Sequence, residues 1–168
     1  MALSMFDASV PSMLRQLASL DAILDKAAAH ATARKIDPAV LLATRLFPDM
    51  FALTRQVQLT CDFAKNTLGR LTGEPPKFAD DEKSLADLKA RIAKTLDYVK
   101  SFAAADIDGT AGKDVTFPIG PQNTMTLTGA QYVVAFALPN FYFHATTAYD
   151  ILRQCGVDIG KRDFLGRT

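Results

Sequence analysis

The stretch TGAQYVVAFALPNFYFHATTAYDILRQCG, residues 128–156, decides the fold predicted for this chain. It has no charged side chain before Asp150, and three consecutive aromatic residues precede His144. A helix that is apolar on every side belongs in the centre of a bundle or in a membrane. Pro139 and several polar residues interrupt the stretch, and no clusters of positive charge flank it, which favours the bundle. We therefore expect this segment to be the central helix of a helical bundle.

Three further helices are predicted before this stretch. The first spans about residues 4–33, where leucine and isoleucine recur at steps of three and four. The second begins at Asp37–Pro38, an N-cap followed by proline, and continues to about residue 71 with a bend at Pro48. The third, about residues 81–104, has one apolar face and one charged face, and we place Arg91 on the charged, solvated face.

The segments between and after these helices carry turn signals. Residues 72–80 form a turn-rich linker, and residues 106–128 alternate polar and apolar side chains around Gly120–Pro121, which predicts a short β-hairpin. The tail from Gly156 is expected to be non-helical and to fold back over the bundle. The predicted fold is all-α, a four-helix bundle with a β-hairpin before the last helix, in one domain spanning residues 1–168.

Composition limits the classes of function. Nineteen Lys and Arg residues against eighteen Asp and Glu give a net charge of +1 with no basic stripe, so we predict no nucleic-acid partner. From the N-terminal residues we expect no signal peptide, and we expect a cytoplasmic protein that does not enter a membrane. Two cysteines, Cys61 and Cys155, permit one disulfide by count, but in a reducing compartment we expect two buried thiols.

The candidate site lies on one face of the last helix, where Asn140, His144 and Thr147 are spaced one turn apart. Buried polar groups need partners, so the three residues are either a satisfied core network or the floor of a small pocket. We expect the His144 imidazole to point into the bundle toward Asp49, whose charge would raise its pKa, or toward Gln56. The other histidine, His30, is expected to be exposed near the end of the first helix.

Several stretches resemble a known superfamily. The helix order, together with DPAVLLATRLFPDMFALTRQVQ, ALPNFYFHATTAYDILRQCGV and IGKRDFLG, is similar to the DinB/YfiT-like four-helix bundles, and to a branch known only as a domain of unknown function. The resemblance implies an up-down-down-up bundle that is commonly dimeric. Its members often bind a divalent metal through three histidines, one in the second helix and two spaced four apart in the fourth. Some transfer thiol cofactors or hydrolyse their adducts.

Carried onto this sequence, the resemblance implies a degenerate metal site. His144 matches the later histidine of the fourth-helix pair, the earlier position is Asn140, and the second helix has no histidine, with Asp49 as its best-placed polar residue. A catalytic zinc normally has three protein ligands. We therefore predict no cofactor, although His144, Asp49 and Asn140 remain weak candidates for a divalent metal.

Two main hypotheses follow for function. In the first, the protein is a DinB-like bundle with a polar pocket formed by Asp49, Gln56, Asn140, His144 and Thr147, which binds a small molecule or has a structural role. In the second, it is a metal-dependent hydrolase or thiol transferase with His144 as the catalytic base or ligand. A third class is an interaction module that would expose an apolar patch. A homodimer is expected.

Overall fold

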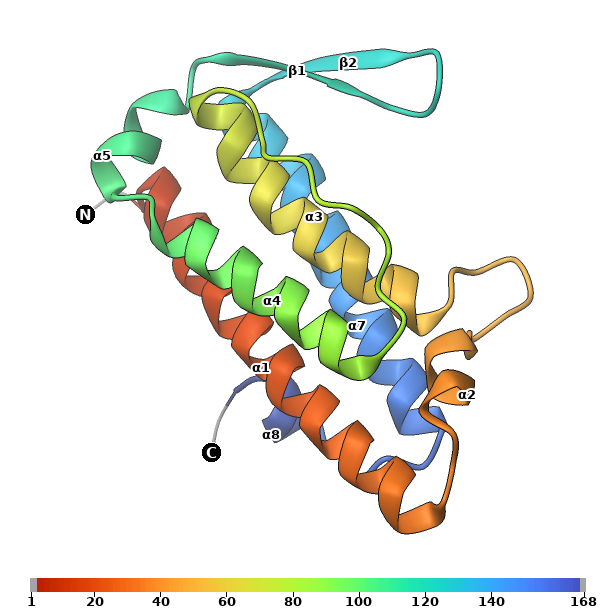
Figure 1. Ribbon diagram of the computed structural model, residues 1–168. Coiled ribbons are helices and arrows are strands. Elements are labelled where there is room, and N and C mark those ends of the chain that lie inside the picture. The colour runs from red at the N-terminus through yellow and green to blue at the C-terminus, as the bar shows by residue number, and fades with distance from the viewer. Residues whose placement is uncertain (1–2, 167–168) are drawn as a thin grey trace.

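The computed structural model describes residues 3–166. Four long helices form the bundle, α1 (Met5–Arg34), α3 (Leu53–Thr72), α4 (Leu85–Lys100) and α7 (Leu138–Gln154). Helices α1 and α7 run in one direction along the bundle, and α3 and α4 run in the other (Figure 1). The predicted up-down-down-up bundle is therefore confirmed. Because α3 and α4 are parallel, the segment of residues 73–84 has to return along the whole length of the bundle between them (Figure 1).

All four long helices contribute to one apolar core. Helix α1 packs against α4, and α3 packs against both α4 and α7. Each fully buried leucine or isoleucine contributes about 1.5–3 kcal/mol relative to an exposed one, so the periodic apolar stripes read from the sequence stabilise the bundle. The fully buried aliphatic residues include Leu17, Leu20 and Leu24 of α1, Val57 and Leu68 of α3, Leu88 and Ile92 of α4, and Ile151 and Leu152 of α7.

The second predicted helix is two helices in the structure. Asp37 caps α2 (Pro38–Ala43) by accepting a hydrogen bond from Ala39 N at 2.9 Å, as expected from the sequence. The helix then ends, and residues 44–52 form a loop that Leu53 N closes by donating to Thr44 O at 2.9 Å. Pro48 explains the break, because its ring cannot donate to a helical turn and clashes with the carbonyl four residues earlier. The prediction of a helix merely bent at Pro48 was wrong.

The last predicted helix contains a widened stretch. It begins with α6 (Gly129–Gln131), capped by Thr128, passes through the π-helix η2 (Tyr132–Ala137) and continues as α7. At the junction Leu138 N donates to Val133 O, five residues earlier. Pro139 removes one donor and crowds the preceding turn, which accounts for a local π-bulge.

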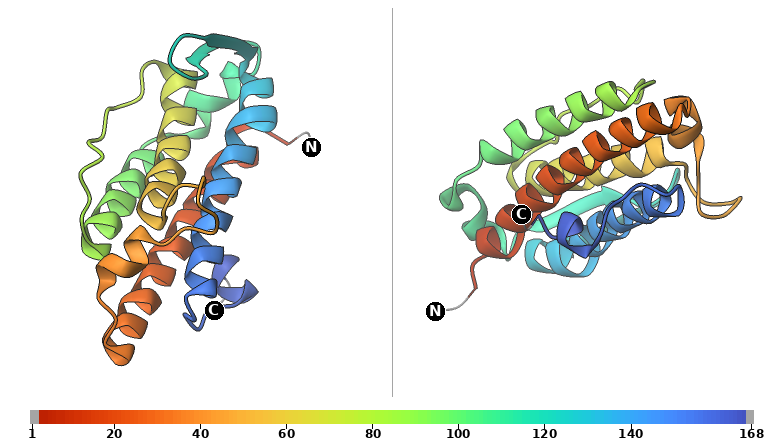
Figure 2. Two further views of the ribbon diagram at one scale, coloured as in Figure 1. Left: turned by 90° about the vertical axis from the view of Figure 1, so that its right-hand side faces the viewer. Right: turned by 90° about the horizontal axis from the view of Figure 1, so that it is seen from below.

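The predicted hairpin is present as β1 (Asp114–Pro118) paired antiparallel with β2 (Thr124–Thr128), with Val115 opposite Leu127. Val115 and Phe117 are buried, and the hairpin lies across one end of the bundle (Figure 2). The third helix is shorter than predicted, since α4 ends at residue 100 and α5 (Ala104–Ile107) with η1 (Asp108–Thr110) leads into the hairpin.

The tail folds back on α1, but it is not wholly non-helical as predicted. It forms the single turn α8 (Lys161–Phe164), held against α1 by an ion pair of 2.6 Å between Lys26 and Asp163. Asp163 also accepts from Gly160 N at 2.8 Å, which caps the turn and explains why it forms. None of the helices within residues 3–166 combines the length and the apolar character needed to cross a membrane.

Candidate functional site

His144 lies in α7 on the face that packs against α3. Its side chain is buried, with the residue 8% exposed. The ring stacks on Phe63 of α3, with centroids 5.5 Å apart and planes at 17°, and Phe143 meets it edge to face at 5.2 Å. Aromatic contacts on two sides hold the imidazole in one orientation between the two helices.

The hydrogen bonds of His144 define its tautomer. Its Nδ1 lies 2.8 Å from Oε1 of Gln56, and the Gln56 amide nitrogen donates to Phe51 O at 3.1 Å. A backbone carbonyl only accepts, so the amide group that faces Phe51 must be the NH2, and the oxygen faces His144. His144 Nδ1 therefore carries the proton and donates. The neutral ring then keeps an unprotonated Nε2 with a free lone pair.

Nε2 of His144 is the open atom of this arrangement. Within residues 3–166 it has no hydrogen-bond partner, and it is not fully buried. Solvent therefore reaches Nε2, while Nδ1 on the other side of the ring is fixed to Gln56. The same division, one ring nitrogen oriented by a partner and the other free, is how proteins present a histidine for binding.

Burial, and secondarily the positive charge of Arg55, lower the pKa of His144 from its usual 6.5 to about 4. Arg55 is itself held by Asp80 at 2.6 Å. The imidazole is consequently neutral at physiological pH. The expectation that a neighbouring carboxylate would raise this pKa was wrong, because the partner of His144 is the uncharged Gln56.

The other predicted site residues do not join His144 in a side-chain network. Asp49 is exposed in the 44–52 loop and makes no hydrogen bond or ion pair with any residue that the structure describes, so it is not the partner of His144. Asn140 is half-buried and donates to Phe136 O at 2.7 Å. Thr147 is buried and donates to Phe143 O at 2.7 Å. Both use their donors on the backbone of their own helix.

A surface hollow of about 460 Å³ lies beside this site, between α7 and the 44–52 loop. Phe143 and Thr147, which lie on either side of His144 along α7, form part of its wall, whereas His144 itself does not line it. Its other walls are largely apolar, with one carboxylate at the edge, and come from Leu46, Met50, Tyr142, Thr146 and Asp150.

These residues do not fit a divalent metal. In the described part of the chain no three His, Cys, Asp or Glu side chains gather closely enough to hold an ion. Of the three weak metal candidates, Asp49 is exposed in the 44–52 loop and Asn140 is a neutral amide, and the Gln56 oxygen beside His144 is already used by Nδ1. Zinc sites need three or four nitrogen, sulfur or carboxylate ligands, so the donor set is incomplete.

His30 and the two cysteines lie outside this site. His30 is half-buried rather than exposed, and its Nε2 is buried without a hydrogen-bond partner among residues 3–166, with Gly156 alongside. Cys61 and Cys155 are both free thiols, as expected, but only Cys61 is buried, since Cys155 is half-buried. Burial raises the pKa of Cys61 to about 12, which keeps it protonated and unreactive.

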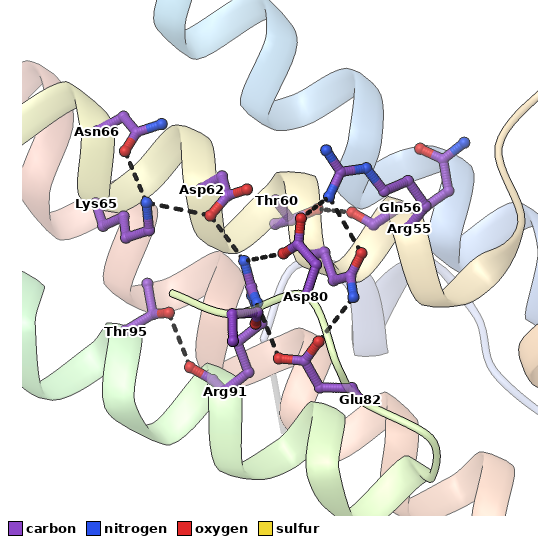
Figure 3. Close-up of polar contacts among 12 residues, drawn as sticks. Arg55, Gln56, Thr60, Asp62, Lys65, Asn66, Asp80, Glu82, Arg91 and Thr95 are labelled. Carbon is purple, nitrogen blue, oxygen red and sulfur yellow. Dashed lines mark hydrogen bonds and ion pairs between the residues drawn. The ribbon is translucent and has the colours of Figure 1, made fainter. Parts of the chain in front are cut away.

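A charged cluster between α3 and α4 was missed by sequence reasoning. Arg91, predicted to be solvated, has a side chain only 2% exposed. Its guanidinium contacts Asp62 of α3 at 2.8 Å, and Asp80 at 3.0 Å and Glu82 at 2.8 Å of the connecting segment (Figure 3). Helical periodicity does not report long-range ion pairs, so the burial of Arg91 could not be read from it. The one signal in the sequence was the run of acidic residues at 80–82 just before α4.

Further polar residues of α3 join the charged cluster around Arg91. Lys65 contacts Asp62 at 3.2 Å and donates to Asn66 at 2.8 Å (Figure 3). Gln58 donates to Glu82 at 2.7 Å. The cluster thereby attaches the connecting segment to α3 and α4 along the side of the bundle opposite to α7 (Figure 3).

An up-down-down-up bundle whose polar site lies between its second and fourth long helices is a bundle of the DinB-like class. The chain matches the family model "Domain of unknown function (DUF1993)" over residues 5–165, and it belongs to this family. It is also similar to the crystal structure of a DinB family member protein from Shewanella denitrificans, with 43% identity and a TM-score of 0.88, covering 97% of this chain and 92% of that one. A comparison with curated proteins finds none that matches.

Proposed function

We propose that the protein binds a small molecule at the His144 site and that Nε2 of His144 accepts a hydrogen bond from it. The observation that carries the proposal is the chain from Phe51 O through the Gln56 amide to His144 Nδ1, because it fixes the tautomer with Nε2 free. A buried side chain oriented on one side and open on the other is prepared for a ligand rather than for packing.

The low pKa of His144, about 4, favours binding over acid–base catalysis. A general base works best when its pKa is near the operating pH, and a group with a pKa of about 4 is a weak base near neutrality. The alternative of a metal-dependent hydrolase or thiol transferase has less support, because Asn140 stands where the resemblance implies a histidine and the second predicted helix supplies no histidine.

The surroundings indicate the character of the ligand. The adjacent hollow of about 460 Å³ is walled by Met50, Tyr142 and Phe143. Apolar walls with a few placed polar groups are typical of small-molecule pockets. We therefore propose a ligand with an apolar body and one hydrogen-bond donor, such as a hydroxyl or an amide N–H, directed at His144.

The proposal can be tested by an NMR screen of uncharged aromatic amides and phenols against the ¹⁵N-labelled protein. Binders should perturb His144 Nε2 and the amides of Phe143 and Thr147, and lose affinity in His144→Phe. The same substitution at the other histidine, His30→Phe, is the matched control and should leave binding unchanged. Binding that is equal in both variants would contradict the proposal.

Metal analysis separates the two functions. Protein purified without a tag should contain less than stoichiometric zinc, manganese or nickel, in the same amount as His144→Ala. One equivalent of metal that is lost in His144→Ala would instead support the hydrolase or transferase alternative.

We also propose that the chain forms a homodimer. Several large apolar side chains are more than half exposed, and C2 pairing is the commonest way to cover such groups. Sedimentation at micromolar concentration should give twice the chain mass of 18.2 kDa, and a single species at the chain mass would refute the dimer. The exposed residues are Val40, Phe47, Phe51, Val134 and Phe143, together with Leu3 near the N-terminus.

A further inference from the structure

Arg70 lies in the last turn of α3, far from the His144 site. Fourteen residues separate it from Gln56, which is roughly 21 Å along the helix axis. Its guanidinium is half-buried and lies over the rings of Phe117 and Tyr132, with its Cζ 5.5 Å and 5.9 Å from their centroids. NH1 donates to the Tyr132 hydroxyl at 3.0 Å. Two rings and one hydrogen bond thus fix the direction of the guanidinium.

The guanidinium has no carboxylate partner. Among the described residues, no Asp or Glu oxygen lies within 4.0 Å of it, in contrast to Arg55 and Arg91 on the same side of the bundle. Arginine presents five N–H donors in a planar fork that matches carboxylate and phosphate, and only one contact is made here. A half-buried, oriented cation with unused donors has the chemistry of an anion receptor.

Arg70 lines a hollow of about 750 Å³ between α3, residues 73–78 of the connecting segment and β1. At one edge of the hollow Pro75 packs directly on α3 at Gly69, where a Cβ atom would lie only 2.5 Å from Pro75 Cα, so this contact requires glycine. Phe78 and two prolines form its apolar wall, and Asn66 and Thr116 supply neutral polar groups.

The charges that line the hollow leave a positive surplus. Lys65, Arg70 and Lys77 face Asp62 and Glu74. Asp62 is already shared between Lys65 and Arg91, so it offers little to Arg70. Glu74 is exposed and makes no ion pair with a described residue.

The C-terminal end of α3 would oppose an anion, because its free carbonyls carry partial negative charge. Lys113 reduces this opposition by donating from Nζ to Leu71 O at 2.7 Å. The field at the hollow is therefore set by the cationic side chains more than by the helix end.

We propose that this hollow binds the carboxylate or phosphate group of a small organic molecule, with the Arg70 guanidinium as the main ligand and Lys77 as a second cation. The site is separate from the one at His144, and either can be present without the other. An anion would accept hydrogen bonds from the free edge of the Arg70 fork, and its organic part would lie against Phe78.

The test uses sodium phosphate and sodium succinate as probes, each titrated into the ¹⁵N-labelled full chain at constant ionic strength. Saturable shifts of Arg70 Nε–H and of the Asn66 and Thr116 amides are expected with at least one probe. A response to phosphate alone identifies phosphoryl ligands, and a response to succinate alone identifies carboxylates. No saturable response to either probe would overturn the proposal.

Variants that are expected to change the affinity for the anion in opposite directions make the test more specific. Arg70→Gln should weaken binding by roughly tenfold or more, since hydrogen bonds to charged groups are the strong ones. Glu74→Gln removes a competing carboxylate and should tighten binding. Arg34→Gln, the same change on an exposed residue at the far end of α1, should have no effect.

The amide spectrum of Arg70→Gln shows whether this variant folds. If it does not fold, a substitution of the exposed Lys77 still tests the proposal. Lys77→Gln changes only a surface side chain and should weaken binding several-fold. Binding that is unchanged in every folded variant among Arg70→Gln, Lys77→Gln and Glu74→Gln would overturn the proposal.

Discussion

Helix α3 buries polar side chains on two sides, and the two clusters differ in how their charge is handled. Toward α7, His144 is kept neutral and bonded to the neutral Gln56 amide. Toward α4, Arg91 stays charged and is surrounded by the carboxylates of Asp62, Asp80 and Glu82. Neutralising a group avoids the desolvation cost, whereas pairing charges has to recover it through geometry.

The difference separates a structural cluster from a candidate site. Three of the four polar contacts of the Arg91 guanidinium are to the connecting segment, and the carboxylates of that segment have further partners in Gln58 and Arg55, so little capacity is left for a ligand. His144 keeps one unused acceptor that solvent reaches. Polar atoms with spare capacity, rather than the number of charges, indicate where this protein can bind something.

The largest expected effect is on the charged cluster. Arg91→Met should lower the free energy of unfolding by about 3–5 kcal/mol, because it leaves the buried carboxylate of Glu82 without its cation and leaves Asp62 with Lys65 alone. Urea denaturation measures the loss. Lys94→Met, an exposed lysine on the same helix, is the control and should cost less than about 1 kcal/mol. An Arg91→Met protein as stable as this control would mean that the cluster is not coupled to folding.

The next effect concerns the pH dependence of stability. The pKa of His144 is about 4 in the folded protein and 6.5 when unfolded, so between these values the unfolded state binds more protons. The contribution of the neutral His144 ring to the free energy of unfolding is fully present above pH 6.5. This free energy falls by about 3 kcal/mol as the pH drops toward 4. Urea denaturation at a series of pH values should give a smaller slope for His144→Phe than for the wild type, and equal slopes would contradict burial of the neutral ring.

A smaller effect is expected from the hydrogen bond itself. Gln56→Leu leaves His144 Nδ1–H without a partner and should cost about 1–3 kcal/mol. In a double-mutant cycle with His144→Phe, the second substitution should cost less than it does alone, because the two residues share the interaction. Additive costs in thermal or urea unfolding would mean that Gln56 and His144 act independently.

The smallest effect belongs to the exposed pair between Lys26 and Asp163. Their side chains are 50% and 27% exposed, and such pairs contribute roughly 0–1 kcal/mol. Lys26→Gln should therefore shift the urea midpoint only slightly, and the shift should disappear at high salt. If Lys26→Gln lowered the free energy of unfolding as much as Arg91→Met does, exposed and buried ion pairs would contribute equally to stability, which would contradict this account.

The bundle and the hairpin follow from local signals in the sequence. Periodic apolar residues such as Leu88 and Ile92 predict helices because one stripe must face the core, and Asp37–Pro38 marks a helix start. The break at 44–52 was missed because Leu46 and Met50 continue the helical spacing across Pro48. The π-helix before Pro139 was missed for the same reason, since spacing does not report hydrogen-bond register.

The site was predictable only in part. The spacing of α7 places His144 on the face toward α3, and Gln56 was among the residues named for the pocket. Asp49 was not predictable as exposed, because it lies in the loop at 44–52, where the expected helix is interrupted. Arg91 looked solvated because its partners Asp80 and Glu82 lie in a segment without periodicity, whose path over α4 is set by tertiary packing.

The most direct test of the account is the protonation of the His144 imidazole, followed by long-range ¹H–¹⁵N spectra from pH 3.5 to 8. We expect an Nδ1–H tautomer, with Nε2 unprotonated down to a pKa of about 4. Gln56→Leu should release the preference for this tautomer. A ring protonated on Nε2 near neutral pH, or one that titrates at or above the usual histidine value of 6.5, would contradict the oriented and open acceptor on which the proposed function rests.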